Sequence, residues 1–589
     1  MRIHAHITRL LGVLLLFSAC PKQSGVTATQ DQPPEQSQTA PQPPTEPLAL
    51  GKIASGRGAA VATAHPLATE AAAQVLADGG NAVDAWITAS LVIAVTQPQS
   101  SGIGGGGFAL VRTSTGEAKA YDFREEAPMA TALEDYLDDS GQAVAERSRH
   151  HGLAVGVPGL IRGLADVHRA HGVLQWSRLV MPATEIAEHG FAVGRDLARA
   201  IEVVEPFMSP AAKELFYPDG KALLQGQILK QPALAQTLKA IADDGPDVFY
   251  QGPIAEDIVA TVADHGGVMN VRDLAGYETR TLEALVGEGF GHTVLTMPQP
   301  SAGGAQVLAM AEFLSRWSVQ LDSAVFPRDH AMAESMRRSF LLRLAYSGDA
   351  TQPARTIDDV FPADVRNQMA ASYDQKTASS SDALDLRDAL DEHPQTTHIS
   401  VVDGDGMVVS STHTVNLWLG SAILTSQTGI ILNNELDDFS YTLGQSNAFG
   451  LMGSAANLIA PGARPVSSMA PTIVLAGERP VLVVGTPGGT RIPTTIVQVM
   501  ERVLTQHQSL VDAVRAPRLH HQAFPDQVWV EEGVGGDAIA QTLGEFGHEV
   551  ERKSAWCNVM AIVLGADGLM DAVADPRGEG AAWVAHPTE

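Results

Sequence analysis

The chain has 589 residues, of which 45% are hydrophobic, so it is long enough for two or three average domains or for one large α/β unit with a sizeable core. Its 39 basic and 67 acidic side chains leave a net charge of −28, which argues against nucleic acid as a partner and favours solubility. After the first 20 residues, no segment is apolar enough to be expected to span a membrane.

Residues 1–20 have the pattern of a secretory leader. Two arginines supply positive charge, and residues 10–17 form an apolar run too short to cross a bilayer, which takes about 20 residues. The leader ends in Leu-Phe-Ser-Ala-Cys, which resembles a bacterial lipobox with Phe where Leu is commoner. The resemblance implies that Cys20 is lipidated and anchors the protein on the periplasmic side of a bacterial membrane. The alternative is ordinary leader cleavage just before Cys20.

Residues 21–50 form a separate segment of biased composition. Between residues 21 and 48 the chain holds seven Pro and six Gln and almost no large apolar side chain. Such a segment cannot bury a core and is predicted to be a semi-extended tether. The only cysteine besides Cys20 is Cys557, so no intrachain disulfide is expected if Cys20 is acylated, and Cys557 is assigned no chemistry.

The folded part is predicted to start with a strand at residues 59–64 and a helix at 67–77, which two glycines close. Asn81 opens a second, apolar helix. The glycine-rich run at 102–108 lacks the Gly-Lys-Ser/Thr ending of a phosphate loop and precedes a strand rather than a helix. It therefore does not indicate nucleotide binding.

A hairpin and a long helical region follow. Residues 108–112 and 118–123 are predicted to pair about a Ser-Thr-Gly turn and to deliver Arg124. Residues from about 129 to 370 are expected to be mostly helical, and the polar residues 373–394 to form a mobile segment.

A second hairpin is predicted around Asp405. Two runs of β-favouring residues, 399–402 and 407–415, flank Asp-Gly-Asp-Gly, whose glycines permit the positive φ of a tight turn. A turn centred on Asp405 places Thr396 opposite Thr414, and a two-residue turn shifts that pairing by one. Because residues i and i+2 share a face, one face is largely polar, a pattern that an exposed strand explains about as well as a functional site. Its residues are Thr396, His398, Ser400, Ser410, Thr412 and Thr414.

The stretch that begins this hairpin resembles the start of the small subunit of a γ-glutamyltranspeptidase. The resemblance rests on Gln-Thr-Thr-His-x-Ser-Val-x-Asp at 395–403, on Asn416 and on Leu-Asn-Asn-Glu-Leu-Asp-Asp-Phe-Ser at 432–440, and it extends over residues 51–583. Members of this family are N-terminal-nucleophile hydrolases, in which a Thr cleaves the bond before itself and then acts as the nucleophile. A hydroxyl needs a base close by, and a freed α-amine with a pKa of about 7.7–8.0 can be that base.

The resemblance implies an α+β fold of four layers, an αββα sandwich, made as one precursor. Cleavage before Thr396 would split it into a large subunit of residues 51–395 and a small catalytic subunit of residues 396–589, which stay together as a heterodimer. The expected reaction is attack on γ-glutamyl amides such as glutathione, giving a γ-glutamyl-Thr ester that water or an amino acid or peptide amine resolves. No cofactor and no metal are expected.

The same resemblance assigns the site residues. Thr396 is the nucleophile, Thr414 hydrogen-bonds its hydroxyl, and Gly488 and Gly489 resemble the family's oxyanion loop, where glycines let backbone N–H groups approach a developing charge. The γ-glutamyl group carries an α-carboxylate and an α-ammonium, so its pocket needs both types of charge. The residues expected to bind the carboxylate are Arg124, Ser467 and Ser468, and those expected to bind the ammonium are Asp438, Asn416 and Glu435.

Other interpretations stay open at this point. Thr397 is a rival nucleophile, although it shares a face with the apolar Ile399. A cephalosporin (glutaryl) acylase on the same fold is the nearest alternative function, and Asp438 argues against it because a glutaryl group has no α-amine. An inactive lipoprotein that only binds peptides is a second alternative, against which the intact nucleophile and glycine set argues.

Two departures from the family pattern concern the walls of the site. The bulky residues 417–419 follow Asn416 and could reshape the acceptor side, and Phe449 stands in the lid loop where Tyr is common. The pairs His150-His151 and His520-His521 suggest a metal, but neither has Cys or carboxylate neighbours at ligand spacing.

Overall fold

The structure is a computed structural model that describes residues 50–320, 327–349, 354–381, 396–443, 447–451 and 453–586. The predicted leader, Cys20 and the tether lie outside these residues, as do Gln395 and most of the segment predicted to be mobile. None of the described helices is long and apolar enough to cross a membrane.

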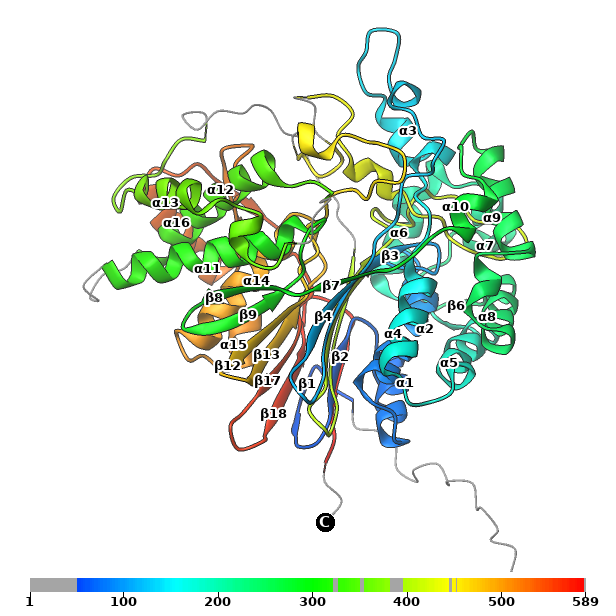
Figure 1. Cartoon of the computed structure of the whole chain (residues 1–589), viewed down its shortest axis with the longest axis horizontal. Helices are drawn as coiled ribbons and strands as arrows, with labels where there is room; N and C mark the ends of the chain where they lie inside the picture. Colours follow the sequence, from blue (N-terminus) through cyan, green and yellow to red (C-terminus); the bar gives the residue numbers. More distant parts are fainter. Residues whose placement is uncertain are drawn as a thin grey trace, which may run out of the picture. The chain divides into compact units, whose positions relative to one another are not determined.

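Two antiparallel sheets of seven strands each form the middle of the fold (Figure 1). The strands of the first sheet, in spatial order, are β19 (Ala581–Val584), β2 (Ala60–Thr63), β10 (Thr397–Val402), β11 (Val408–Thr414), β3 (Gly106–Arg112), β4 (Ala118–Phe123) and β7 (Arg280–Glu283). Those of the second are β1 (Ile53–Gly56), β18 (Met570–Ala574), β17 (Met560–Leu564), β13 (Arg479–Gly485), β12 (Thr472–Ala476), β9 (His292–Thr296) and β8 (Leu285–Gly289).

Helices cover the outer face of each sheet, which gives the predicted αββα sandwich. One apolar core joins the first sheet to α1 (Pro66–Ala77), α2 (Ala82–Thr96), α4 (Leu160–His171), α5 (Trp176–His189), α6 (Arg195–Val204), α7 (Pro210–Phe216), α8 (Pro232–Asp244) and α9 (Pro253–Asp264). A second core joins the two sheets to each other and to α11 (Ala302–Gln320), α12 (Arg328–Tyr346), α13 (Ala363–Ala371), α14 (Arg491–Leu504), α15 (Leu510–Arg515) and α16 (Val534–Glu545).

Smaller elements complete the described part of the chain. They are the short helices α3 (Ala145–Arg149) and α10 (Val271–Ala275), a two-stranded sheet of β5 (Phe191–Ala192) and β6 (Ile228–Leu229), and a three-stranded sheet of β14 (Leu519–His520), β15 (Val528–Glu531) and β16 (Val550–Lys553).

The hairpin predicted around Asp405 is the pair β10 and β11 in the centre of the first sheet. Thr397 lies opposite His413, which is the register of a turn centred on Asp405. Ile399 packs into the core with the helices, whereas Ser400 lies between the sheets and donates a hydrogen bond of 3.1 Å to the carbonyl of Met560 on β17. The polar face of the hairpin is therefore buried between the two sheets and is not an exposed surface.

The elements predicted for the N-terminal part are confirmed. Asn81 caps α2 and forms a reciprocal capping box with Asp84, whose carboxylate accepts from the Asn81 backbone N–H. The hairpin of β3 and β4 is also present.

The prediction of a mostly helical region from 129 to 370 missed five strands, the two-residue strands β5 and β6 and the longer β7 to β9, which join the two main sheets. Glycines at 287 and 289 interrupt the apolar alternation of β8, so its strand pattern is weak. Phe290 and Gly291 both have positive φ and make the tight turn between β8 and β9. A side chain at Gly287 or Gly289 would press on α11, so these glycines let the helix lie close to the sheet.

Candidate active site

A small cavity lies at the end of the β10–β11 hairpin where Thr396 begins the described segment. It spans about 300 Å³ of space, part of which is open to solvent. It brings together every predicted site residue of the folded part except Gly488, and its lining consists of Arg124, Thr396, Thr414, Asn416, Glu435, Asp438, Phe449, Leu451, Ser467, Ser468, Met469, Gly489 and Ile492.

Thr396 and Thr414 are positioned by the register of the hairpin. Because Thr397 pairs with His413, the next positions outward are Thr396 and Thr414, on opposite strands. Both side chains are buried, and the hydroxyl oxygen of Thr414 accepts a hydrogen bond of 2.8 Å from the backbone N–H of Asn416. Thr397 does not line the cavity, and its hydroxyl is buried without a hydrogen-bond partner among the residues that the structure describes. Of the two threonines, only Thr396 can therefore present its hydroxyl to a ligand in the cavity.

The glycine loop before α14 has a backbone that favours glycine at two positions. Gly488 and Gly489 have φ values of 139° and 56°, both in the left-handed half of the map. A Cβ on Gly488 would collide with the Sγ of Cys557, so this cysteine packs directly under the loop. Gly489 itself lines the cavity, which places part of the loop backbone within reach of a ligand.

Arg124 follows β4 and is fully buried with two carboxylates around its guanidinium. It donates from Nη1 to Glu435 and from Nη2 to Asp438, the second at 2.5 Å, while Nε donates to the carbonyl of Pro465 at 3.0 Å. The sequence suggests that this fork binds a ligand carboxylate and that the two acids bind an ammonium. In the structure the three side chains form one ion-paired cluster. Any ligand that they bind therefore contacts charges that are already paired with one another.

Burial controls the protonation of these carboxyls. It raises the pKa of Asp438 to about 6 and that of Glu435 to about 7, although the nearby Arg124 guanidinium lowers both. Glu125 is a third buried carboxyl beside them, and burial together with the charge of Glu435 raises its pKa well above the usual range. Both of its carboxyl oxygens are without a donor among the described residues. Burial therefore favours the protonated form of the carboxyls in this cluster.

Ser467 and Ser468 directly follow Pro465 and Val466, whose carbonyls accept from Arg124, and they lie next to the loop that precedes α11. The backbone N–H of Ser467 donates to the carbonyl of Pro300 at 2.9 Å, which holds the two segments together. The Ser467 hydroxyl accepts from the N–H of Met469 at 3.1 Å, and the Ser468 hydroxyl accepts from Nη1 of Arg343 at 2.6 Å. Sequence analysis missed Arg343. The available signal was the recurrence of arginine at 337, 338 and 343 within one helical segment.

The bulky residues after Asn416 do not reshape this cavity, because none of residues 417–419 lines it. Leu419 packs into the core with the helices instead. Phe449 does line the cavity, as expected for the lid loop, although residues 444–446 of that loop lie outside the description.

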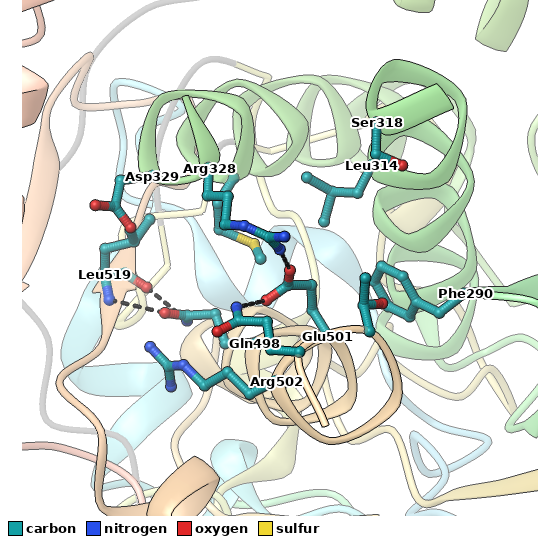
Figure 2. A pocket seen from close by; sticks show the side chains of 12 residues that line it. Phe290, Leu314, Ser318, Arg328, Asp329, Gln498, Glu501, Arg502 and Leu519 are labelled. Atoms are coloured by element: carbon teal, nitrogen blue, oxygen red, sulfur yellow. Dashed lines mark hydrogen bonds and ion pairs between the residues drawn. The ribbon is translucent and has the colours of Figure 1, made fainter. Parts of the chain in front are cut away.

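A larger cavity of about 850 Å³ lies between α11, α12 and α14, and its lining does not suit the expected acyl-transfer reaction. In Figure 2 its Arg328 and Glu501 point toward each other, and they form an ion pair. The cavity contains none of the predicted nucleophile, oxyanion-loop or substrate-binding residues.

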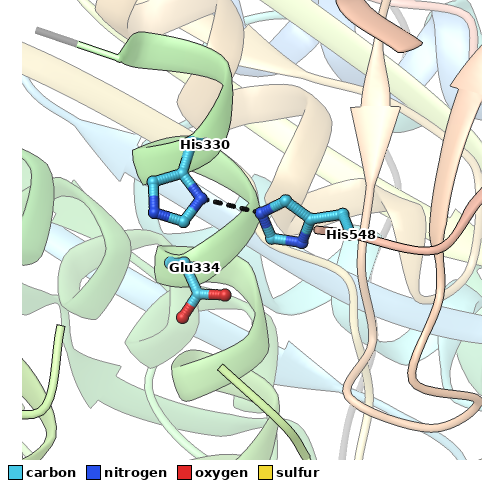
Figure 3. Close-up of side chains that lie close together, drawn as sticks. All are labelled: His330, Glu334 and His548. Carbon is cyan, nitrogen blue, oxygen red and sulfur yellow. Dashed lines mark hydrogen bonds between the residues drawn. The ribbon is translucent and has the colours of Figure 1, made fainter. Parts of the chain in front are cut away.

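The two predicted histidine pairs have ordinary partners. His150 stacks on Phe207, and His520 bonds to Thr494 at 2.9 Å. Among the described residues, the one group with metal-ligand geometry is His330, Glu334 and His548, whose ligand atoms lie within 4.8 Å of one another (Figure 3).

This group does not fit a divalent cation. The two rings already bond to each other at 2.8 Å. The carboxylate of Glu334 pairs with Arg337 and Arg338, so a dication would be buried beside two guanidinium groups.

Comparison with known proteins gives consistent matches. The sequence matches the Gamma-glutamyltranspeptidase family over residues 68–585. A glutathione hydrolase proenzyme of Pseudomonas aeruginosa is 38% identical over 542 residues, covering 90% of this chain and 95% of the relative. One of Escherichia coli is 35% identical over 527 residues, covering 88% and 90%.

Two solved structures share the fold. Cephalosporin acylase from Bacillus halodurans matches with a TM-score of 0.79 at 24% identity, covering 94% of this chain and all of that chain, which is a likeness of fold alone. The gamma-glutamyltranspeptidase of Helicobacter pylori matches with a TM-score of 0.51 at 31% identity, covering 54% of this chain and 91% of that chain.

Proposed function

The chain belongs to the γ-glutamyltranspeptidase family, and we propose that it is a γ-glutamyl hydrolase and transpeptidase acting on glutathione and related γ-glutamyl amides. The observation that carries the proposal is the cavity that joins Thr396 and Gly489 to residues of both charge types. A γ-glutamyl group needs this combination, because it carries a carboxylate and an ammonium on the same carbon.

The proposed reaction starts after cleavage between Gln395 and Thr396. The freed α-amine of Thr396 takes the proton of its own hydroxyl as that oxygen attacks the γ-carbonyl carbon. The carbonyl oxygen becomes an oxyanion, which backbone N–H groups of Gly488 and Gly489 stabilise. Collapse of this intermediate breaks the C–N bond, passes the proton to the leaving amine and leaves a γ-glutamyl ester on Thr396.

Water or an incoming amine then attacks the ester by the same route. Water releases glutamate, and an amino acid or peptide amine yields a new γ-glutamyl bond. No step calls for a metal or an organic cofactor, since the α-amine supplies the base and the loop supplies the oxyanion donors.

The cephalosporin-acylase alternative is less well supported. Its solved representative shares only the fold at 24% identity, whereas the glutathione hydrolase proenzymes match at 35–38% over most of both chains. The carboxylates of Asp438 and Glu435 in the cavity also have no partner in a glutaryl group.

Self-cleavage is the decisive test of the proposed nucleophile. Purified precursor is expected to split into two fragments, and N-terminal sequencing of the smaller one should give Thr-Thr-His. A Thr396→Ala precursor should remain one chain. A fragment that begins at Thr397, or a wild-type precursor that never cleaves, contradicts the proposal.

We further propose that Cys20 carries lipid and holds the protein at the periplasmic side of a bacterial membrane. The leader and the Pro/Gln-rich tether support this, because together they would place a folded domain at some distance from a lipid anchor. Metabolic labelling with a fatty acid should mark the wild type and not Cys20→Ala. Equal labelling and equal membrane fractionation of the two proteins would refute the anchor.

A further inference from the structure

Arg343 is a buried cation directly behind the wall of the cavity. It lies near the end of α12 and is 6% exposed. Its Nη1 donates to the hydroxyl oxygen of Ser468 at 2.6 Å and lies 3.4 Å from the side-chain oxygen of Gln306. Arg343 does not line the cavity itself, so it can influence a ligand only through Ser468 or through its charge.

The hydrogen bond from Arg343 determines whether the Ser468 hydroxyl donates or accepts toward a ligand. A hydroxyl has one proton to donate and lone pairs that accept. Since a guanidinium can only donate, Ser468 accepts on the side of Arg343, and its own proton is left for a different acceptor. Ser467 is arranged in the same way, because its hydroxyl accepts from the backbone N–H of Met469 at 3.1 Å. Two O–H donors are thereby available on one wall of the cavity.

A pair of hydroxyl donors suits the two oxygens of a carboxylate. Arg124, the other cation of the cavity, is already bonded to Glu435 and Asp438. Burial raises the pKa of Asp438, and the positive charges of Arg124 and, to a smaller extent, Arg343 lower it. The serine hydroxyls, rather than a guanidinium without a partner, are therefore the donors that a carboxylate can use here.

We propose that Arg343 is a specificity-determining positioning residue, which sets Ser468 as a hydrogen-bond donor to the α-carboxylate of the donor substrate. Arg343 thus selects donors that carry this carboxylate over donors that lack it. The inference rests on the proposed function, because it presupposes a γ-glutamyl donor in the cavity.

The test compares two anilides that differ only in the α-carboxylate, γ-glutamyl-p-nitroanilide and 4-aminobutyryl-p-nitroanilide. Processed wild type, Arg343→Gln, Ser468→Ala and the double variant are assayed. Hydrogen bonds to charged groups contribute about 1.5–3 kcal/mol, so Arg343→Gln should raise KM for the γ-glutamyl compound roughly 10- to 100-fold. Its kcat should change little, and the 4-aminobutyryl compound should be nearly unaffected.

Two further results separate positioning from general structural support. The double variant should lose no more than Ser468→Ala alone, because Arg343 acts through that hydroxyl. Arg343→Lys keeps the charge without the planar fork and should fall between wild type and Arg343→Gln. Arg337→Lys is the matched control on the same helix and should leave the ratio of the two anilides unchanged.

The outcomes that overturn the inference are specific. Equal loss on both anilides after Arg343→Gln, or additive losses for Arg343 and Ser468, shows that Arg343 does not act on the carboxylate through Ser468. If Arg343→Gln fails to fold or to self-cleave, Arg343→Lys decides, and an unchanged anilide ratio in that variant overturns the inference. If wild type does not turn over the γ-glutamyl anilide at all, the proposed function itself fails.

Discussion

At Asp438 one carboxylate has to serve two cations, the guanidinium of Arg124 and the proposed donor ammonium. The geometry allows this, because Arg124 contacts one oxygen, Oδ2, at 2.5 Å and the side chain still lines the cavity. The negative charge of Asp438, and not only its shape, is therefore expected to bind the ammonium. Asp438→Asn removes this charge and keeps the shape of the side chain.

Asp438→Asn should weaken turnover of γ-glutamyl-p-nitroanilide and spare a glutaryl anilide, which has no amine. Truncating one partner of a desolvated charge pair costs about 2–5 kcal/mol, or roughly 30- to several-thousand-fold in kcat/KM. Most of the loss should appear in KM, since the ammonium is bound in both the ground and the transition state. If the variant slows both anilides equally, or if wild type already prefers the glutaryl compound, the acylase alternative takes precedence.

The protonation of Asp438 gives an independent prediction in pH. Burial raises its pKa to about 6, so below that pH the carboxyl takes up a proton and loses its attraction for the ammonium. The ratio of kcat/KM for the γ-glutamyl anilide to that for the glutaryl anilide should therefore fall as pH drops through about 6. Taking the ratio removes the titration of the Thr396 amine, which both reactions share. In Asp438→Asn the fall near pH 6 should be lost, so that only the titration of Glu435 near pH 7 remains, and a flat ratio in the wild type would contradict the assignment.

The residues of the site divide into those that a motif predicts and those that only packing reveals. Thr396, Asp438 and the Ser pair stand in long ordered motifs, so the resemblance predicted that they gather in one cavity. For Glu125, the sequence shows only an acidic residue that follows a predicted strand, and it does not indicate that the side chain is buried. Its burial depends on two glycines from distant segments, since a Cβ on Gly106 or Gly156 would collide with its side chain. No local pattern records such a contact.

Among the elements, the central hairpin was predictable and the β8–β9 hairpin was not. The turn at Asp405 lies between two strong β-favouring runs, so its register followed from the sequence. In β8, the close approach of α11 requires glycine at two positions. The strand therefore lacks apolar side chains there, and strand prediction depends on such side chains.

Helix α12 shows a similar dependence on its surroundings, because its buried charges pair with one another and with residues far along the chain. Glu334 contacts Arg337 and Arg338 on the same helix, and its carboxylate also accepts from the hydroxyl of Ser379 at 2.6 Å. Arg337 pairs in addition with Asp526. The cluster thus joins α12 to the segment that leads toward the cleavage site.

The cluster on α12 should stabilise the fold in a pH-dependent way. Burial alone would raise the pKa of Glu334, but the guanidinium groups of Arg337 and Arg338 lower it to about 2, below its ordinary value of 4.5. A carboxyl whose folded pKa is lowered stabilises the protein above its unfolded pKa and loses that contribution as pH falls toward the folded value.

Glu334→Gln is expected to destabilise the protein by about 3–5 kcal/mol at neutral pH, since it leaves the buried guanidinium of Arg338 without its carboxylate and that of Arg337 with Asp526 alone. The difference in Tm between wild type and variant should shrink as pH falls from about 5 toward 2. Thermal unfolding of the Thr396→Ala precursor with and without the substitution measures this on a single intact chain. A difference that stays constant with pH would show that the charge of Glu334 is not what stabilises the cluster.

On the scale of the whole molecule, the proposed cleavage point does not separate two domains. Both sheets contain strands from before and from after Thr396. The pairings that join the two parts are β1 with β18, β9 with β12, β2 with β19, β2 with β10, and β3 with β11. The sequence predicted the four layers but not this interleaving, because strand order depends on pairings between residues hundreds of positions apart.

The interleaving predicts that the two fragments remain one particle after cleavage. Separating them would break all of these ladders and leave unpaired strand edges in both sheets, which is costly in water. Cleaved protein should therefore elute from a sizing column at the volume of the uncleaved Thr396→Ala chain and show two bands only in denaturing gels. The fragments, once parted in denaturant, should fail to refold singly, because each holds only part of every core. Fragments that separate on simple dilution, or a small fragment that folds alone, would contradict the shared sheets.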